Sequence, residues 1–223
     1  MKDTVNVIAR IRSDFPTKFG IPRQSGLTEL ESVIVFEPEY RNEDALRGID
    51  GFSHLWLIWK FSKAERDTWS PTVRPPRLGG NKRLGVFATR SPFRPNPIGL
   101  SCVKLLRTEK TENGTVLIVS GADLMDGTPI YDIKPYLPYA DCRTDATGGF
   151  TDSSRFARLE VDFPEELLKK ISPSRRQGLI SALAEDPRPH YQNDPERVYG
   201  FSFADKEIKF TVKDGTLTVT EVD

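Results

Sequence analysis

The 223-residue sequence predicts a mainly β fold, either a barrel or a sandwich, over residues 1–150 and a small α+β domain over 155–223. Three observations support this division. Short β-branched runs separated by long Pro- and Gly-rich loops fill the first two-thirds of the chain. The segment 144–154, TDATGGFTDSS, is small and polar, as in a linker or an exposed loop. After this segment come two stretches with helical spacing of apolar residues and a C-terminal stretch in which apolar and polar residues alternate.

The first domain is expected to contain six strands, which are Val5–Ile11, Ser32–Phe36, Gly51–Phe61, Leu84–Thr89, Ile98–Leu106 and Thr115–Ser120. The third of these, GFSHLWLIWKF, is almost continuously apolar, so we expect it to be buried on both faces. Asn113-Gly114 predicts the turn between the last two strands. NEDALRG, 42–48, predicts one short helix, with Asn42 as its N-cap and Gly48 at its C-terminal end.

The second domain is expected to begin with helices over Pro164–Ile171 and Ser174–Ala184. Pro164 suits the first turn of a helix, and apolar residues recur at helical spacing in the second segment. The tail, residues 198–222, alternates apolar and polar residues like a three-stranded meander. Ala204-Asp205 and Asp214-Gly215 mark its two expected turns.

Composition narrows the class of protein. The 32 basic and 32 acidic residues balance, and no apolar run approaches the roughly 18–20 residues that span a bilayer. The N-terminus lacks the apolar core of a signal peptide, so we expect a cytoplasmic protein without membrane contact. Cys102 and Cys142 are too few for a disulfide scaffold and lack metal-binding spacing, so we expect free thiols.

The absence of common catalytic motifs narrows the chemistry further. The sequence has no GxGxxG, GxxxxGK[ST], HExxH or GxSxG pattern. With only His54 and His190, a histidine metal cage cannot be built. We interpret His54, within SHLWLIW, as a packed and hydrogen-bonded strand histidine rather than a catalytic base.

The loop GVFATRSPFRPNPIG, 85–99, carries three prolines and two arginines. Prolines remove much of the entropy cost of ordering a loop, which suits a preorganised site. Arg90 and Arg94 offer planar forks for a carboxylate or a phosphate, and Phe87 and Phe93 can stack or pack. By itself the loop fits equally a binding site and a stiff corner between strands.

Charge is segregated along the chain around this loop. No Asp or Glu occurs from Thr68 to Thr108, a stretch that contains eight lysines and arginines. If the stretch forms one face, it creates a positive potential suited to a phosphate-bearing partner. A solvated face balanced by acids from other strands explains the pattern equally well.

Three further stretches combine turn residues with groups that bind ligands. The segment 122–141, ADLMDGTPIYDIKPYLPYAD, contains four carboxylates and a repeated proline–tyrosine pairing that could form a stacking wall for a base. GIPRQSG, 20–26, is either a turn or part of a ligand rim. DPRPHY, 186–191, fits RNA contact through charge and stacking, or the end of a helix.

These stretches, together with HLWLIWKF and residues 72–101, closely resemble the TsaA-like family of S-adenosylmethionine-dependent tRNA methyltransferases. The resemblance covers nearly the whole chain. It implies a small β-barrel domain over 1–150 in place of a Rossmann fold, consistent with the missing GxGxxG. It also implies a homodimer, no metal, and transfer of a methyl group to N6 of threonylcarbamoyl-adenosine beside the anticodon of threonine-accepting tRNA.

The resemblance assigns cofactor contacts by matching motifs. They are Pro22, Arg23, Gln24, Ser62, Lys63, Arg90, Leu100, Asp123, Leu124, Met125 and Asp126. An acid of DLMD is expected to accept a hydrogen bond from the cofactor's ribose or amino group. Arg90 is expected to face the cofactor's methionine carboxylate or a nearby phosphate. Ser62 departs from the family, whose members usually carry histidine there, so a role that needs an imidazole is lost or supplied elsewhere.

The remaining assignments concern the tRNA substrate. Asp141 and Tyr139 are the catalytic candidates, with Asp141 or a carbonyl of KPYLPY as the proton acceptor. The expected tRNA contacts are Arg94, Lys134, Arg143, Arg188 and Tyr191. Two other functions fit the same sequence, namely a non-catalytic RNA-binding module and a methyltransferase of this fold that acts on a small molecule.

Overall fold

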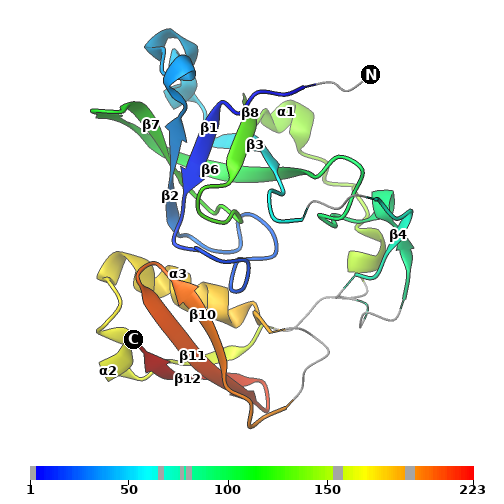
Figure 1. Ribbon diagram of the computed structural model, residues 1–223, viewed down its shortest axis with the longest axis vertical. Helices are drawn as coiled ribbons and strands as arrows, with labels where there is room; N and C mark the ends of the chain where they lie inside the picture. The colour runs from blue at the N-terminus through cyan, green and yellow to red at the C-terminus, as the bar shows by residue number, and fades with distance from the viewer. Residues whose placement is uncertain (1–3, 65–67, 76–77, 79–81, 153–157, 189–193) are drawn as a thin grey trace.

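A computed structural model describes residues 4–64, 68–75, 78, 82–152, 158–188 and 194–223. Within these residues, six antiparallel strands form a closed barrel in the order β1-β2-β7-β6-β3-β8, with β8 pairing back onto β1 (Figure 1). The strands are β1 (Ala9–Arg12), β2 (Glu31–Phe36), β3 (His54–Lys60), β6 (Ile98–Thr111), β7 (Gly114–Ser120) and β8 (Pro129–Pro135). The mainly β character expected from the sequence is confirmed.

Strand β3 shows how the barrel wall is built. Leu55, Leu57 and Trp59 are buried inside the barrel, and the alternate side chains between them are only half-buried on the outer wall. The expectation that this strand is buried on both faces is therefore wrong. A barrel strand has one face in the core, and the apolar residues Trp56 and Ile58 lie on its other face.

The hairpin of β6 and β7 is longer than its apolar residues indicate. β6 continues through a charged stretch to Thr111, and Gly114, at φ +90°, forms the expected turn. Arg107 forms ion pairs with Glu31 and Glu109 on the exposed surface. Cross-strand hydrogen bonds thus extend β6 beyond the point where alternation ends, which is why its predicted end is five residues short.

Strand β8 was not expected, because prolines stand at both of its ends and Asp132 and Lys134 interrupt its apolar residues. Proline is tolerated at the first position of a strand, where its missing N–H costs little. Asp132 and Lys134 form an ion pair of 2.9 Å. This strand closes the barrel between β1 and β3.

The connections around the barrel contain short 3-10 helices: η1 (Pro38–Tyr40), η2 (Glu43–Leu46), η3 (Ile49–Gly51), η5 (Val86–Ala88) and η6 (Gly149–Thr151). Asn42 caps η2 by accepting the N–H of Asp44 (3.0 Å), as the sequence predicts. The strand expected over 84–89 is mostly absent. Only β5 (Leu84–Gly85) pairs, with β4 (Thr72–Val73), and η5 follows it directly.

The C-terminal domain packs α2 (Glu165–Leu168) and α3 (Pro173–Ala184) on a sheet of order β10-β11-β12-β9 in the described chain. The expected meander is present as β10 (Tyr199–Phe203), β11 (Lys206–Lys213) and β12 (Thr216–Val222). Both expected turns lie where positive φ occurs, at Ala204 and Asp214. β9 (Glu160–Asp162), parallel to β12, is too short to show a pattern and was not expected.

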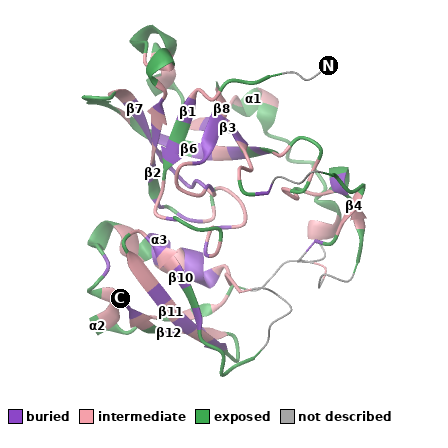
Figure 2. Ribbon diagram, viewed as in Figure 1, coloured by how far each residue is buried: buried purple, intermediate pink, exposed green. Residues whose placement is uncertain are grey.

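Each domain has its own hydrophobic core, drawn as the buried interiors in Figure 2. The C-terminal core also contains Phe15 and Leu30 from the first segment of the chain. A Cβ on Gly178 of α3 would lie 2.4 Å from Leu30, so this glycine permits close packing of the two domains. Arg175 and Asp14 form an ion pair of 2.9 Å across the same contact. Among the described residues, no helix is long and apolar enough to cross a membrane.

Candidate functional site

The loop after β5 is held in shape by its own hydroxyl groups. Thr89 Oγ1 donates to the carbonyl of Val86 (2.9 Å) and accepts the N–H of Ser91 (3.3 Å). Ser91 Oγ accepts the N–H of Phe93 (3.2 Å), and the guanidinium of Arg94 donates to the carbonyl of Thr89 (3.2 Å). Together with the prolines, these bonds preorganise the loop.

A cleft of about 790 Å³ lies between this loop, the segment after β3 and the 18–24 segment. Its size is within the range of roughly 300–1000 Å³ that holds small ligands. Nine of the eleven expected cofactor residues line it: Pro22, Arg23, Gln24, Ser62, Lys63, Arg90, Leu100, Asp123 and Met125. The fold thus brings together motifs that lie far apart in the sequence.

Asp123 places a carboxylate in the wall of this cleft. The indole N–H of Trp59 donates to Ser101 Oγ (2.9 Å), and Ser101 Oγ donates to Asp123 Oδ1 (2.5 Å). Because the indole can only donate, the single hydroxyl proton of Ser101 is directed at Asp123. Burial raises the pKa of Asp123, and the Ser101 hydrogen bond and the charge of Arg90 oppose that rise.

A chain of hydrogen bonds joins the cleft to the C-terminal domain. Arg90 Nη1 donates to Gln24 Oε1 (2.5 Å), and the amide of Gln24 donates to the carbonyl of Arg23. The Arg23 guanidinium donates to the backbone carbonyls of Asp186 (2.9 Å) and Arg188 (3.3 Å). The backbone around Asp186 therefore helps position the side chains of the cleft.

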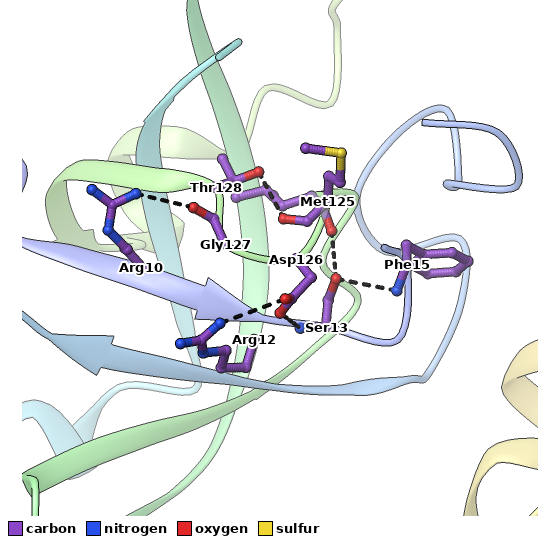
Figure 3. Close-up of polar contacts among 9 residues, drawn as sticks. Arg10, Arg12, Ser13, Phe15, Met125, Asp126, Gly127 and Thr128 are labelled. Carbon is purple, nitrogen blue, oxygen red and sulfur yellow. Dashed lines mark hydrogen bonds and ion pairs between the residues drawn. The ribbon is translucent and has the colours of Figure 1, made fainter. Parts of the chain in front are cut away.

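Two of the expected cofactor residues do not line the cleft. Leu124 is fully buried in the barrel core. Asp126 faces away from the cleft, where it accepts the N–H of Ser13 (3.1 Å) and forms an ion pair with Arg12 (3.5 Å; Figure 3). The DLMD segment thus alternates, and only Asp123 and Met125 are directed at the cleft.

Asp141 and Tyr139 lie on α1 (Pro138–Asp141), outside the residues that line the cleft. Asp141 Oδ2 accepts the N–H of Leu137 (2.8 Å) and the indole N–H of Trp56 (3.1 Å). These hydrogen bonds lower the pKa of Asp141. Tyr139 is 85% exposed.

The expected tRNA contacts are dispersed. Arg94 lines the cleft, Lys134 is ion-paired on β8, and Arg143 is exposed with its guanidinium donating to the carbonyl of Cys142 (3.0 Å). Arg188 forms a two-bond pair with Asp186 (2.8 and 2.9 Å), and only 12% of its side chain is exposed. Tyr191, like His190, lies outside the described residues.

Sequence reasoning missed the residues that support the cleft from inside the barrel. Trp59, Gly99 and Ser101 share the inward face of the β3–β6 pair, where Trp59 is opposite Gly99. A Cβ on Gly99 would lie 2.2 Å from the Trp59 ring, so only glycine fits beneath the indole. The two-residue period of 98–106 places Ser101 inward, and a hydroxyl at a core position was the signal that could have identified it.

The two expected free thiols and the packed histidine are confirmed. Cys102 and Cys142 are unpaired, and burial raises the pKa of Cys102. His54 Nδ1 lies 2.9 Å from Ser53 Oγ, and its ring meets that of Tyr136 edge to face. Within the described ranges, no group of three His, Cys, Asp or Glu side chains is placed to hold a metal ion.

The fold and the cleft define a class of protein: an antiparallel barrel with a cleft of ligand size whose lining contains both a carboxylate and guanidinium groups. Comparison with known proteins identifies the class more narrowly. Residues 10–142 match the tRNA-methyltransferase O N-terminal domain family, and residues 156–223 match the TrmO C-terminal domain family. This chain belongs to the tRNA-methyltransferase O (TrmO) family.

Individual relatives cover nearly the whole chain. The tRNA (adenine(37)-N6)-methyltransferase of Escherichia coli is 41% identical, over 95% of this chain and 94% of the relative. A Pseudomonas aeruginosa protein described as a candidate S-adenosylmethionine-dependent methyltransferase is also 41% identical, over 93% and 92%. The crystal structure of TrmO from Pseudomonas aeruginosa superposes with a TM-score of 0.78 at 34% identity, covering all of both chains.

Proposed function

We propose that this protein transfers a methyl group from S-adenosylmethionine to N6 of adenosine 37 in tRNA. The observation that carries the proposal is the single cleft formed by nine residues from separate motifs. The family and the names of its full-length relatives support the same activity. The proposed substrate base carries a threonylcarbamoyl group, in a threonine-accepting tRNA that is present in the cytoplasm.

The residues of the cleft fit this methyl donor. Ile21, Pro22, Ile98, Leu100 and Met125 supply apolar surface for an adenine ring. The carboxylate of Asp123 suits ribose hydroxyls or the ammonium group, and a guanidinium such as that of Arg90 suits the methionine carboxylate. A ligand with both charges thus meets both complementary groups.

The chemistry requires mainly positioning. When bound, the cofactor would supply an activated methyl group on its sulfonium. Transfer would break the methyl–sulfur bond with its electron pair left on sulfur, form the methyl–N6 bond and release a proton from N6. The preorganised 86–97 loop and the Ser101–Asp123 bond hold the cleft groups in place, and positioning of this kind supplies much of the rate. Arg94, which belongs to this loop and lines the cleft, is proposed to bind the threonyl carboxylate.

Two carboxylates are candidates for the proton acceptor. Asp141 was assigned from the sequence, together with Tyr139, whereas Asp123 lines the cleft and has a raised pKa, which makes it the stronger base. Separate Asp→Asn variants distinguish them, and the acceptor is the one whose loss lowers the rate of a single turnover with saturating cofactor.

We also propose a homodimer, supported by the exposed side chains of Ile98 and Leu100 on the outer wall of β6. Because Leu100 also lines the cleft, a second copy on this wall would border the cofactor. Leu100→Glu should then yield a monomer in sedimentation analysis and weaken cofactor binding. A wild-type protein that sediments as a monomer at micromolar concentration contradicts the dimer.

We propose a separate function for each domain: residues 1–150 hold the cofactor and the reacting base, and residues 155–223 contact tRNA. Truncation is a poor test, because removing the second domain would expose Phe15 and Leu30. Charge reversal at the exposed Arg197, Arg197→Glu, should weaken tRNA binding without changing cofactor affinity. Lys110→Glu, on the distal β6–β7 hairpin, is the matched control.

One experiment tests the whole proposal. The protein is incubated with methyl-labelled S-adenosylmethionine and tRNA that carries or lacks the threonylcarbamoyl group. Label should appear only in the modified tRNA. Equal labelling of bare adenosine refutes the proposed substrate, and failure to bind the cofactor in a calorimetric titration refutes any methyltransferase activity and favours a non-catalytic RNA-binding module.

A further inference from the structure

A second, wider groove of about 2110 Å³ adjoins the cofactor cleft and extends to the β4–β5 ribbon and the 147–151 segment. Figure 1 places β4 to one side of the barrel. Among the described residues that line this groove none is Asp or Glu, whereas five are arginines: Arg23, Arg74, Arg83, Arg90 and Arg94. The groove therefore has a positive lining on a chain whose net charge is zero.

The groove also exposes large aromatic rings. Trp69 is 55% exposed and Phe87 is 74% exposed. The two rings lie nearly parallel, with centroids 6.4 Å apart and an interplanar angle of 30°. Phe93, on the same loop as Phe87, is a third exposed aromatic in the lining. Neither barrel packing nor the proposed contacts to the methyl donor require Trp69 to be exposed.

We propose that this groove binds the unpaired RNA nucleotides next to the methylated base, which stack on the Trp69–Phe87 wall while Arg74 and Arg83 contact their phosphates. Arginines alternating with exposed aromatic rings are the combination that binds single-stranded RNA, because every base has a face to stack and every linkage carries a charge. An acidic peptide would use the arginines but not the flat rings. This inference rests on the proposed function.

The position of the groove fits this role. Gln24, Phe87, Arg90 and Arg94 line both the groove and the cofactor cleft, so the two are continuous. A base that is methylated on N6 must leave its stack to reach the donor, and its neighbours then lose a stacking partner. The Trp69–Phe87 wall replaces that partner at the entrance to the cleft.

The protein side of the test uses Trp69, which lines the groove but not the cleft. Affinity for a fluorescein-labelled anticodon stem–loop RNA is measured by anisotropy for wild type, Trp69→Ala and Trp69→Phe. We expect about a tenfold loss for alanine and less than about threefold for phenylalanine, since stacking on an aromatic ring contributes a factor of that order. Phe52→Ala, an exposed aromatic outside both sites, is the control.

The RNA side of the test removes bases instead of side chains. An abasic nucleotide beside the target adenosine should weaken binding to wild type by about the same tenfold and have little further effect on Trp69→Ala. Independent, multiplicative losses overturn the stacking contact, as does wild-type affinity in Trp69→Ala. The wild-type comparison of the two RNAs keeps the test decisive even if the alanine variant folds poorly.

Salt dependence tests the arginines separately. Each phosphate contact to single-stranded nucleic acid contributes about 0.7 to the slope of log K against log salt. Arg74→Gln and Arg83→Gln should each reduce the slope by about that amount, and Arg47→Gln, outside the groove, should not. Unchanged slopes for both groove variants overturn the phosphate contacts.

Cofactor titration distinguishes failure of the RNA-groove assignment from failure of the proposed methyltransferase function. Trp69→Ala should bind S-adenosylmethionine as wild type does. If wild type binds the cofactor and RNA but the groove variants match it, only the groove assignment fails. If wild type binds neither, the proposed function fails.

Discussion

The proposed cofactor cleft and the loop that follows α3 each contain an arginine and an aspartate, but the two arginines have different hydrogen-bond partners. In the C-terminal loop, Arg188 and Asp186 are joined by two hydrogen bonds and both side chains are largely buried. In the cleft, Arg90 is exposed and donates to Gln24, while Asp123 takes its hydrogen bond from Ser101. The first pair is satisfied within the protein, whereas the cleft keeps its opposite charges separate.

The difference separates a structural ion pair from a ligand site made of the same residue types. Asp123 is partly buried, and Arg90 donates its hydrogen bond to Gln24 instead, so the carboxylate retains much of the desolvation cost that raises its pKa. A ligand that carries both a positive and a negative group can offset the desolvation cost of Asp123, and this favours binding of such a ligand in the cleft. Arg188 already has a carboxylate partner, and its backbone carbonyl accepts a hydrogen bond from Arg23.

The largest expected effect comes from Arg90→Ala. Loss of a charged hydrogen-bond donor to the ligand should lower kcat/KM for methyl transfer by about 10–100-fold. The melting temperature should change by less than about 2 °C, since the side chain is exposed and outside the core. Arg47→Ala, an exposed arginine paired with Asp44, is the control and should leave both quantities unchanged. A loss of activity that follows unfolding would assign Arg90 to stability instead.

The next effect is expected from Asp123→Asn, which should weaken cofactor binding about tenfold by removing a charged acceptor. Its stability should depend on pH in a defined direction. Since burial raises the pKa of Asp123 above its ordinary 3.8, ionisation disfavours the folded state as pH rises through the native pKa. The asparagine variant should therefore be at least as stable as wild type at pH 7. This advantage should shrink as the pH falls toward the ordinary aspartate pKa of 3.8.

Thermal melts of wild type and Asp123→Asn between pH 3 and pH 8 measure that difference. A variant that is markedly less stable at pH 7 than at pH 4, relative to wild type, would mean that attraction to Arg90 outweighs burial. Ser101→Ala is the matched comparison, because it keeps the carboxylate and removes only the hydroxyl that holds it.

A smaller effect on activity is expected from Arg188→Ala, together with a clear loss of stability. The variant removes the two guanidinium hydrogen bonds to the mostly buried Asp186, which should cost about 1–3 kcal/mol in urea unfolding. Cofactor affinity should fall by less than about tenfold, since the effect reaches the cleft only through Arg23 and Gln24. The double variant Arg188→Ala with Asp186→Ala should be more stable than Arg188→Ala alone, because it also removes the buried carboxylate that lost the two guanidinium hydrogen bonds. An equal or lower stability of the double variant contradicts this view of the pair.

Much of the fold could be predicted because its strands show their pattern locally. The alternation of β10 to β12 and the turns at Ala204 and Asp214 depend only on neighbouring residues. Strand β8 was missed because its pairing with β1 and β3 is decided by distant partners, not by its own composition. The half-buried outer wall of β3 likewise depends on closure of the sheet, which apolar content alone cannot reveal.

The sequence predicted most of the residues that line the candidate site, but not the directions of their side chains. Motifs placed nine residues around one cleft, yet the direction of each DLMD side chain depends on β1, since Arg12 and Ser13 bind Asp126 on the far side. The support of Asp123 by Trp59 and Ser101 arises from the register of β3 and β6. Cross-strand register is a property of the folded sheet, so the sequence can mark Ser101 as a hydroxyl at an inward position but cannot show that Trp59 and Asp123 are its partners.

The smallest effect is expected from Asp141→Asn, which extends the comparison to a third carboxylate. Asp141 is exposed, and the N–H groups of Leu137 and Trp56 lower its pKa, so it is a weaker base than an ordinary aspartate. Asparagine retains an oxygen that can accept these bonds, so we expect methyl transfer to fall by less than about fivefold at pH 7. Single-turnover rates with saturating cofactor and modified tRNA provide the measurement, and Tyr139→Phe tests the neighbouring hydroxyl in the same assay. A loss above about 100-fold for Asp141→Asn, with unchanged cofactor affinity, would instead identify Asp141 as the group that removes the N6 proton, and would require tRNA or a second copy of the chain to bring α1 to the cleft.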